Sequence, residues 1–221
     1  MPTYAPSPRR AARNLKLSAA AASALLAAVA GTFMVHAAEH TLMPSPKTVH
    51  IGYFLASAKP VLTIDSGDIV TLESAAAIVP SVVDQSGVVP PSAVPQYQRD
   101  IYGEVKDRGP GPHVLTGPIE IRGAEPGDVL EVRILDVSLA LDYGYNRQRP
   151  YTGALPDEFT AYWNRIIPID REKKTAEVAK GVVIPVDKPF FGTMGLAPDP
   201  SMGRSAAARP ASIPAISTTR I

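Results

Sequence analysis

Two histidines about 60 residues apart, His50 and His113, are the side chains of this sequence best suited to chemistry. An imidazole can bind a metal ion, or it can act as a general base on an attacking water molecule. His113 stands between Gly111-Pro112 and Thr116-Gly117-Pro118, and such residues build rigid loops where backbone can approach a ligand closely. We therefore rank His113 above His50. The alternative for each is a histidine that is only hydrogen-bonded within a β-domain.

Three aspartates are the candidate carboxylates, and all three belong to one repeated phrase. Asp65-Ser66-Gly67-Asp68 and Glu125-Pro126-Gly127-Asp128 each precede an apolar run. In both phrases Gly can take a positive φ, which a tight turn requires, and Asp can cap that turn. Turn formation is therefore the expected role of most of these three aspartates. Asp68 is kept as a candidate metal ligand beside His50 and His113.

The elements that position these residues are predicted to be strands. From Thr48 to Ile134 the apolar residues come in short runs bounded by Gly, Pro, Asp and Ser, as in Pro60–Ile64, Ile69–Glu73 and Val129–Ile134. The 23 prolines of the 221 residues also disfavour long helices. We expect residues 48–198 to be mostly strand, with no helix longer than about three turns. The predicted fold class is mainly β, a β-sandwich or barrel-like domain.

Two regions have a less definite pattern. Residues 87–98 and 142–158 are rich in loop-forming residues and are predicted to be long loops, which are usually functional or mobile. Residues 164–191 allow either a short helix in their charged middle or a hairpin with a third short strand. We prefer the hairpin because apolar, β-branched runs flank the charged residues on both sides.

Composition excludes several classes of function. Residues 38–221 carry 18 basic and 21 acidic side chains, so the body of the chain lacks the clustered positive charge of nucleic-acid binders. The sequence has no Cys, which removes disulfide scaffolds, cysteine nucleophiles and cysteine-ligated zinc sites. No Gly-x-Ser-x-Gly elbow is present, so a serine hydrolase triad is disfavoured.

The first 37 residues are typical of an export signal. Arg9, Arg10 and Arg13 precede an uncharged, Ala-rich run that ends in Val35-His36-Ala37. This is the order of a signal peptide with cleavage after Ala37, and the Arg pair partly matches a twin-arginine signal. We expect a periplasmic or secreted protein without stable membrane association after cleavage. The alternative is an uncleaved membrane anchor.

Five stretches of the sequence resemble the acetamidase/formamidase family of amidohydrolases. In the family's order they are Val49–Phe54, Lys59–Asp68, Gly111–Ile119, Gly123–Leu130 and Lys188–Pro198. The resemblance implies a β-rich fold and hydrolysis of the C–N bond of small linear amides such as formamide or acetamide. It also implies that a divalent metal, zinc or calcium, is plausible, that no other cofactor is needed, and that a homo-oligomer is compatible with the sequence.

Given that resemblance, each chemical task of amide hydrolysis has a candidate residue. An activated water, a donor to the carbonyl oxygen and an acid for the leaving nitrogen are required. His113 is the expected base, and Thr116 with the amide of Gly117 would donate to the oxyanion. His50, His113 and Asp68 are the candidate metal ligands.

The resemblance ends near Arg204. Residues 204–221 contain no Gly, acid or aromatic residue, which is typical of out-of-frame translation of GC-rich DNA or of a flexible terminus. We therefore divide the chain into a signal peptide (1–37), a partial β-domain (38–203) and a disordered tail (204–221), and expect truncation to impair activity.

An alternative function is an exported, non-catalytic ligand-binding or carbohydrate-binding module. Such modules stack sugars on exposed aromatic residues, and five aromatic residues cluster in this sequence: Tyr143, Tyr145, Tyr151, Tyr162 and Trp163.

Overall fold

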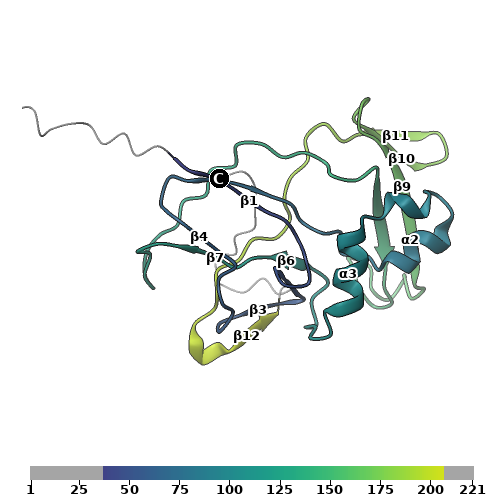
Figure 1. Cartoon of the computed structure of the whole chain (residues 1–221). Helices are drawn as coiled ribbons and strands as arrows, with labels where there is room; N and C mark the ends of the chain where they lie inside the picture. The colour runs from purple at the N-terminus through teal and green to yellow at the C-terminus, as the bar shows by residue number, and fades with distance from the viewer. Residues whose placement is uncertain (1–36, 207–221) are drawn as a thin grey trace, which may run out of the picture. The chain divides into compact units, whose positions relative to one another are not determined.

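The computed structural model describes residues 37–206, in which short strands outnumber helices (Figure 1). The mainly β fold class is confirmed, and neither α-helix exceeds three turns. The expectation that residues 48–198 are mostly strand is wrong, because most of them lie in turns and loops. The predicted signal peptide up to His36, and residues 207–221, lie outside the described residues. Within the described part, no helix has the length and apolarity needed to cross a membrane.

Two parallel strand pairs form one hydrophobic cluster. Strand β1 (Glu39–Leu42) pairs with β5 (Ile69–Leu72), and β4 (Leu62–Ile64) pairs with β7 (Ile119–Ile121). The two runs expected at residues 60–64 and 69–73 are thus confirmed as β4 and β5. The cluster is built on three buried residues: Leu42, Ile64 and Val70.

Both predicted turns form in the expected way. Gly67 has φ +97° and Gly127 has φ +107°. In each turn the aspartate after the glycine accepts a hydrogen bond from the backbone amide three residues earlier, at 2.9 Å for Asp68 and 2.8 Å for Asp128. The turn-capping role of these aspartates is therefore confirmed.

The two histidines are carried by, or next to, a second group of strand pairs. Strand β2 (Val49–Ile51) pairs with β6 (Val114–Thr116), and β3 (Tyr53–Leu55) pairs with β12 (Arg204–Ala206). His50 lies within β2, and His113 immediately precedes β6. Residues 204–206, which we expected to begin a disordered tail, are therefore part of the fold.

The largest sheet is a four-stranded antiparallel one with order β11-β10-β9-β8. Its strands are β8 (Tyr143–Gln148), β9 (Trp163–Asp170), β10 (Thr175–Ala179) and β11 (Val182–Pro185). The preferred hairpin is confirmed, with β10 as the third short strand. Strand β8 falls inside residues 142–158, so the prediction of one continuous loop there is wrong.

Two helices lie beside this sheet (Figure 1). Helix α2 (Pro80–Ser86) begins at a proline and ends before Gly87, whose φ is +64°. Helix α3 (Gln96–Glu104) follows the short η1 turn (Pro91–Ala93). These elements also interrupt the loop predicted at residues 87–98. Val83 of α2 shares one buried cluster with the sheet residues Tyr143 and Ile166 and with Ile78 and Val94. Ile101 of α3 belongs to another cluster, with Val49, Ile51, Ala75 and Val114.

The strand predicted at Val129–Ile134 does not form. The segment has no strand assignment, and its apolar side chains are exposed, with Val129 at 96% and Ile134 at 50%. A strand needs a neighbouring backbone with which to exchange hydrogen bonds, and no described residue supplies one here. The segment therefore has the sequence of a strand without a partner strand.

Close backbone packing at Gly52 holds the histidine-bearing strands to the following loop. Gly52 has φ +81°, and a Cβ atom there would lie 2.5 Å from the Gly111 oxygen and 2.6 Å from the Gly109 oxygen. Its amide donates to the His113 carbonyl at 2.8 Å, and its carbonyl accepts from the Gly111 amide at 3.1 Å. Gly52 thus fixes the backbone on which His113 stands.

We expect Gly52→Ala to cost roughly 2–5 kcal/mol of folding free energy, because a positive φ and a backbone clash add together. Gly67→Ala is the matched control, since Gly67 also has a positive φ but a Cβ atom there would meet no other atom within 4 Å. That change should cost only about 1 kcal/mol. Urea unfolding of both variants measures the difference, and equal costs would contradict the packing argument.

Candidate functional site

One cavity of about 230 Å³ brings His50 and His113 together. Its walls come from β2, β3, β6 and two connecting segments. They are mainly apolar: the aromatic and aliphatic lining includes Phe54, Leu55, Ala75, Val114, Leu115 and Phe191. The polar side chains that line it are His50, Tyr53, Ser74, His113, Thr116 and Thr193. Such a cavity, apolar with a few convergent polar groups, is the usual form of a small-molecule site.

His113 faces this cavity with an imidazole suited to accepting a proton. Burial lowers the pKa of His113, because the charged imidazolium loses solvation. The ring is therefore neutral at neutral pH and keeps one nitrogen lone pair. Its Nε2 atom lies 3.3 Å from the Thr193 hydroxyl oxygen. Thr193 thus fixes the orientation of the ring from a segment 80 residues further along the chain.

His50 is also held neutral by its surroundings. Desolvation lowers the pKa of His50, and this effect outweighs a hydrogen bond to the Gly117 backbone and the charge of Asp107, which raise it. The His50 ring meets the Tyr53 ring edge-on, with ring centroids 5.9 Å apart. Two neutral imidazoles therefore line one cavity, from strands that pair with each other.

A polar network lies behind His50. The hydroxyl of Tyr53 donates to Asp107 at 2.8 Å. Arg204 donates two hydrogen bonds to the same carboxylate, at 2.9 and 2.7 Å, and its guanidinium lies 4.5 Å from the Tyr53 ring centroid. These bonds hold the pKa of Asp107 below its ordinary value, chiefly through Arg204. The network links β12 to the tyrosine that touches His50.

Thr116 and Gly117 line the cavity, but their expected donors have other partners. The Thr116 hydroxyl donates to the Glu73 carbonyl at 3.0 Å, and the Gly117 amide donates to the Thr48 carbonyl at 2.9 Å. Both bonds fix the edge of β6. In this conformation neither donor is directed at a ligand in the cavity, so their oxyanion role stays a prediction.

Asp68 does not line the cavity. Its carboxylate instead contacts the Ala38 backbone, His40 and the Asp65 amide, at the turn between β4 and β5. Asp65 and Asp128 likewise lie outside the cavity lining. Across residues 37–206 no group of three His, Cys, Asp or Glu side chains is arranged to hold a metal ion. The described residues therefore bring together two of the three predicted metal ligands.

Several cavity residues were missed as individual site residues. Phe54, Phe191 and Thr193 belong to stretches that carry the family resemblance, so the sequence marked their segments but gave them no role. Asp107 lies outside those stretches, and its partner Arg204 is 97 residues away in sequence. No local pattern could have found that pair.

Comparison with known proteins settles the family. The sequence model described as the Acetamidase/Formamidase family matches residues 108–218, which is half of the chain. The chain belongs to the acetamidase/formamidase family. The match extends beyond Arg204, so the family pattern continues past the point at which the resemblance was expected to end. No match was found among curated protein sequences.

A solved structure of an acetamidase/formamidase shares the fold of this chain. A predicted acetamidase/formamidase from Thermoanaerobacter tengcongensis aligns with a TM-score of 0.53 at 23% identity, over 74% of this chain and 47% of that one. An acetamidase from Bacillus halodurans aligns with a TM-score of 0.47 at 20% identity, over 72% of this chain and 46% of that one. The 221-residue chain thus spans about half the length of these acetamidase/formamidase structures.

Proposed function

We propose that the cavity of His50 and His113 is part of a site that hydrolyses the C–N bond of small linear amides such as formamide or acetamide. The observation that carries the proposal is the convergence of two neutral histidines on one small, mainly apolar cavity in a chain of the acetamidase/formamidase family. A cavity of about 230 Å³ has room for a short acyl group against its apolar walls and for an attacking water molecule.

His113 has the base role in this reaction. Its neutral imidazole accepts a proton from water as the water oxygen attacks the amide carbonyl carbon. When the tetrahedral intermediate collapses and its C–N bond breaks, the same imidazole returns the proton to the leaving nitrogen, giving a carboxylic acid and ammonia. The acid then loses its proton to solvent and leaves as a carboxylate. The Thr193 hydroxyl holds the ring in orientation, and His50 lies on the same cavity as a second polar contact for the substrate.

A divalent metal fits the described residues only in part. Imidazole nitrogens suit zinc, whereas calcium prefers oxygen ligands, so His50 and His113 favour zinc over calcium. Zinc sites use at least three protein groups, and within residues 37–206 no carboxylate lines this cavity. The described residues do not make a complete site, and no step of the proposed reaction runs through a metal.

Export completes the proposal. We place the mature protein in the periplasm or outside the cell, with a small amide as its substrate and no nucleic-acid partner. This placement is based on the basic, apolar and small-residue order of residues 1–37. A homo-oligomer is compatible with it.

The binding-module alternative is weakened by the aromatic residues themselves. Tyr143 is buried in the core, and Tyr145 donates its hydroxyl to the Ala77 carbonyl at 3.0 Å. Only Tyr151, Tyr162 and Trp163 of the five are exposed. The aromatic cluster is thus divided between the core and the surface.

Ammonia release tests the proposed function. Two proteins are compared: the 221-residue chain, and an extended protein in which the second half of a family-length relative follows Ile221. We expect ammonia from formamide or acetamide, and no binding of oligosaccharides. Absence of ammonia release from every small linear amide by both proteins, or tight oligosaccharide binding, would refute the proposal.

A further inference from the structure

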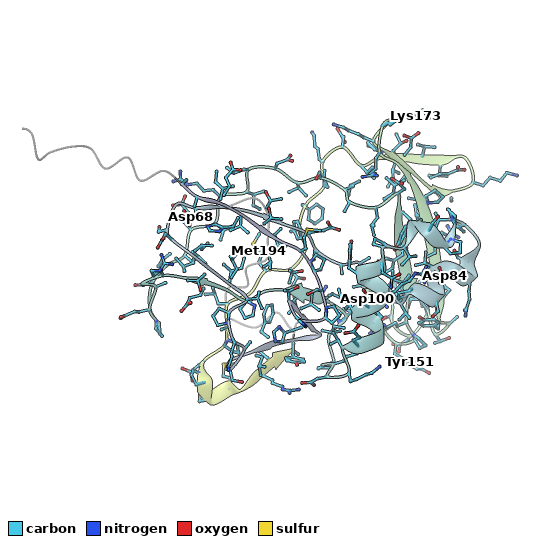
Figure 2. The ribbon with its side chains drawn as sticks, viewed as in Figure 1. Asp68, Asp84, Asp100, Tyr151, Lys173 and Met194 are labelled. Atoms are coloured by element: carbon cyan, nitrogen blue, oxygen red, sulfur yellow. The ribbon has the colours of Figure 1, made fainter. Side chains whose placement is uncertain are left out.

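The carboxylate of Asp68 contacts Ala38 and His40, which lie at the start of the described residues. It is 7% exposed, at the turn that joins β4 to β5 next to β1 (Figure 2). Its Oδ1 atom accepts a hydrogen bond from the Ala38 backbone nitrogen at 2.9 Å. Its Oδ2 atom accepts from the Asp65 amide at 2.9 Å and lies 2.9 Å from His40 Nε2. The bonds from Asp65, His40 and Ala38 hold the pKa of Asp68 at about 2, so the carboxylate is ionised at neutral pH.

The backbone nitrogen of Ala38, which donates to Oδ1 of Asp68, would become the free α-amine of the chain after the predicted cleavage. Hydrolysis of the Ala37–Ala38 peptide bond adds the hydroxyl of water to the Ala37 carbonyl carbon and a hydrogen to the Ala38 nitrogen. The product amine takes up a further proton at neutral pH, since an α-amino group has an ordinary pKa of about 8. A neutral amide donor thereby becomes an ammonium group at the same place in the chain.

We propose that Asp68 is the receptor for the α-ammonium group that export processing creates at Ala38. The proposal rests on the predicted signal cleavage and is independent of the amidase function. Ala38 already lies at hydrogen-bond distance from Oδ1, so docking requires no rearrangement of the turn. A charge-assisted bond is roughly twice as strong as a neutral one, and a pair this little exposed is weakly screened by salt.

Docking of the new terminus fixes the strand that follows it. The Ala38 carbonyl accepts from the Ile69 amide at 2.8 Å, which sets the parallel register of β1 on β5. Leu42, at the end of β1, is then buried in the cluster with Ile64 and Val70. Glu73 directly follows strand β5, and its carbonyl accepts a hydrogen bond from the Thr116 hydroxyl at the cavity edge. Processing thus stabilises the strand from which one cavity wall extends.

The test follows the processed terminus in the full chain. The 221-residue protein is expressed with its export signal, recovered from the periplasm, and its first residue is determined by intact mass. The amine of Ala38 is then acetylated with a small reagent at neutral pH, in native protein and in urea. We expect the native terminus to react at least about tenfold more slowly than the unfolded one, because pairing and burial lower the reactivity of the amine.

Two aspartate variants separate the carboxylate from the turn. Asp68→Asn should lose most of the protection. Asp65→Asn is the matched control, because Asp65 belongs to the same turn but is 56% exposed and pairs with Arg122, and it should keep the protection. If Asp68→Asn does not fold, the ratio of the acetylation rates of the parent protein, native against unfolded in urea, still tests whether the Ala38 amine is protected.

Three results would overturn the proposal. The first is a mature chain that begins at a residue other than Ala38. The second is equal acetylation rates in native and unfolded protein. The third is an equal loss of protection in both aspartate variants.

Discussion

We expect His113→Ala to lower amide turnover by about 100-fold or more, the scale on which enzymes lose activity when a positioned acid–base group is removed. The His113 imidazole is neutral in its partly buried setting, lines the cavity and is oriented by Thr193. The substitution therefore removes the proton acceptor of the proposed reaction. His50→Ala should have a smaller effect, because in the proposed reaction His50 only contacts the substrate. Ammonia release from formamide measures both, in whichever form of the protein shows turnover.

His40→Ala is the matched control for this experiment. His40 contacts the carboxylate of Asp68 and does not line the cavity. Its loss should therefore leave the turnover of the folded protein close to that of the parent. Thermal unfolding of all three variants identifies any loss that is due to misfolding. Equal turnover of His113→Ala and the parent would show that His113 is only a hydrogen-bonded structural histidine.

Local patterns in the sequence predicted the features that depend on a few neighbouring residues. The turns at Gly67 and Gly127 follow from the phrases that contain them, since a positive φ and an aspartate cap are local requirements. Helix α2 had an equally local signal, with Pro80 at its first position and Gly87 after its end. This helix was not predicted, because the short apolar runs around it favoured strands.

Features that depend on partners far apart in the chain could not be predicted from local sequence patterns. Val129–Ile134 has the alternation of a strand, but pairing is decided by whether another backbone lies beside it. The ion pair of Asp107 and Arg204 joins residues 97 positions apart. The meeting of His50 and His113 in one cavity depends on the pairing of β2 with β6, which brings His50 opposite Leu115. The family resemblance marked these two histidines, whereas spacing alone could not place them together.

The unpaired segment also bears on how complete the site is. Val129 and Ile134 expose apolar surface, and Phe190 is 85% exposed close in sequence to cavity residues Phe191 and Thr193. Exposed apolar surface of this kind is usually covered by another part of a protein or by a partner. The 221-residue chain aligns with 47% of the solved Thermoanaerobacter structure.

We therefore expect the 221-residue chain assayed alone to turn over formamide at least about 100-fold more slowly than the extended protein. One reason is chemical: among residues 37–206, no carboxylate lines the cavity to assist the two histidines in moving protons. The other is energetic, because exposed apolar segments favour aggregation over a rigid cavity. Ammonia release and light scattering of the two proteins, at equal concentration, measure both effects. Full activity of the shorter chain, without aggregation, would show that residues 38–206 already contain a complete site.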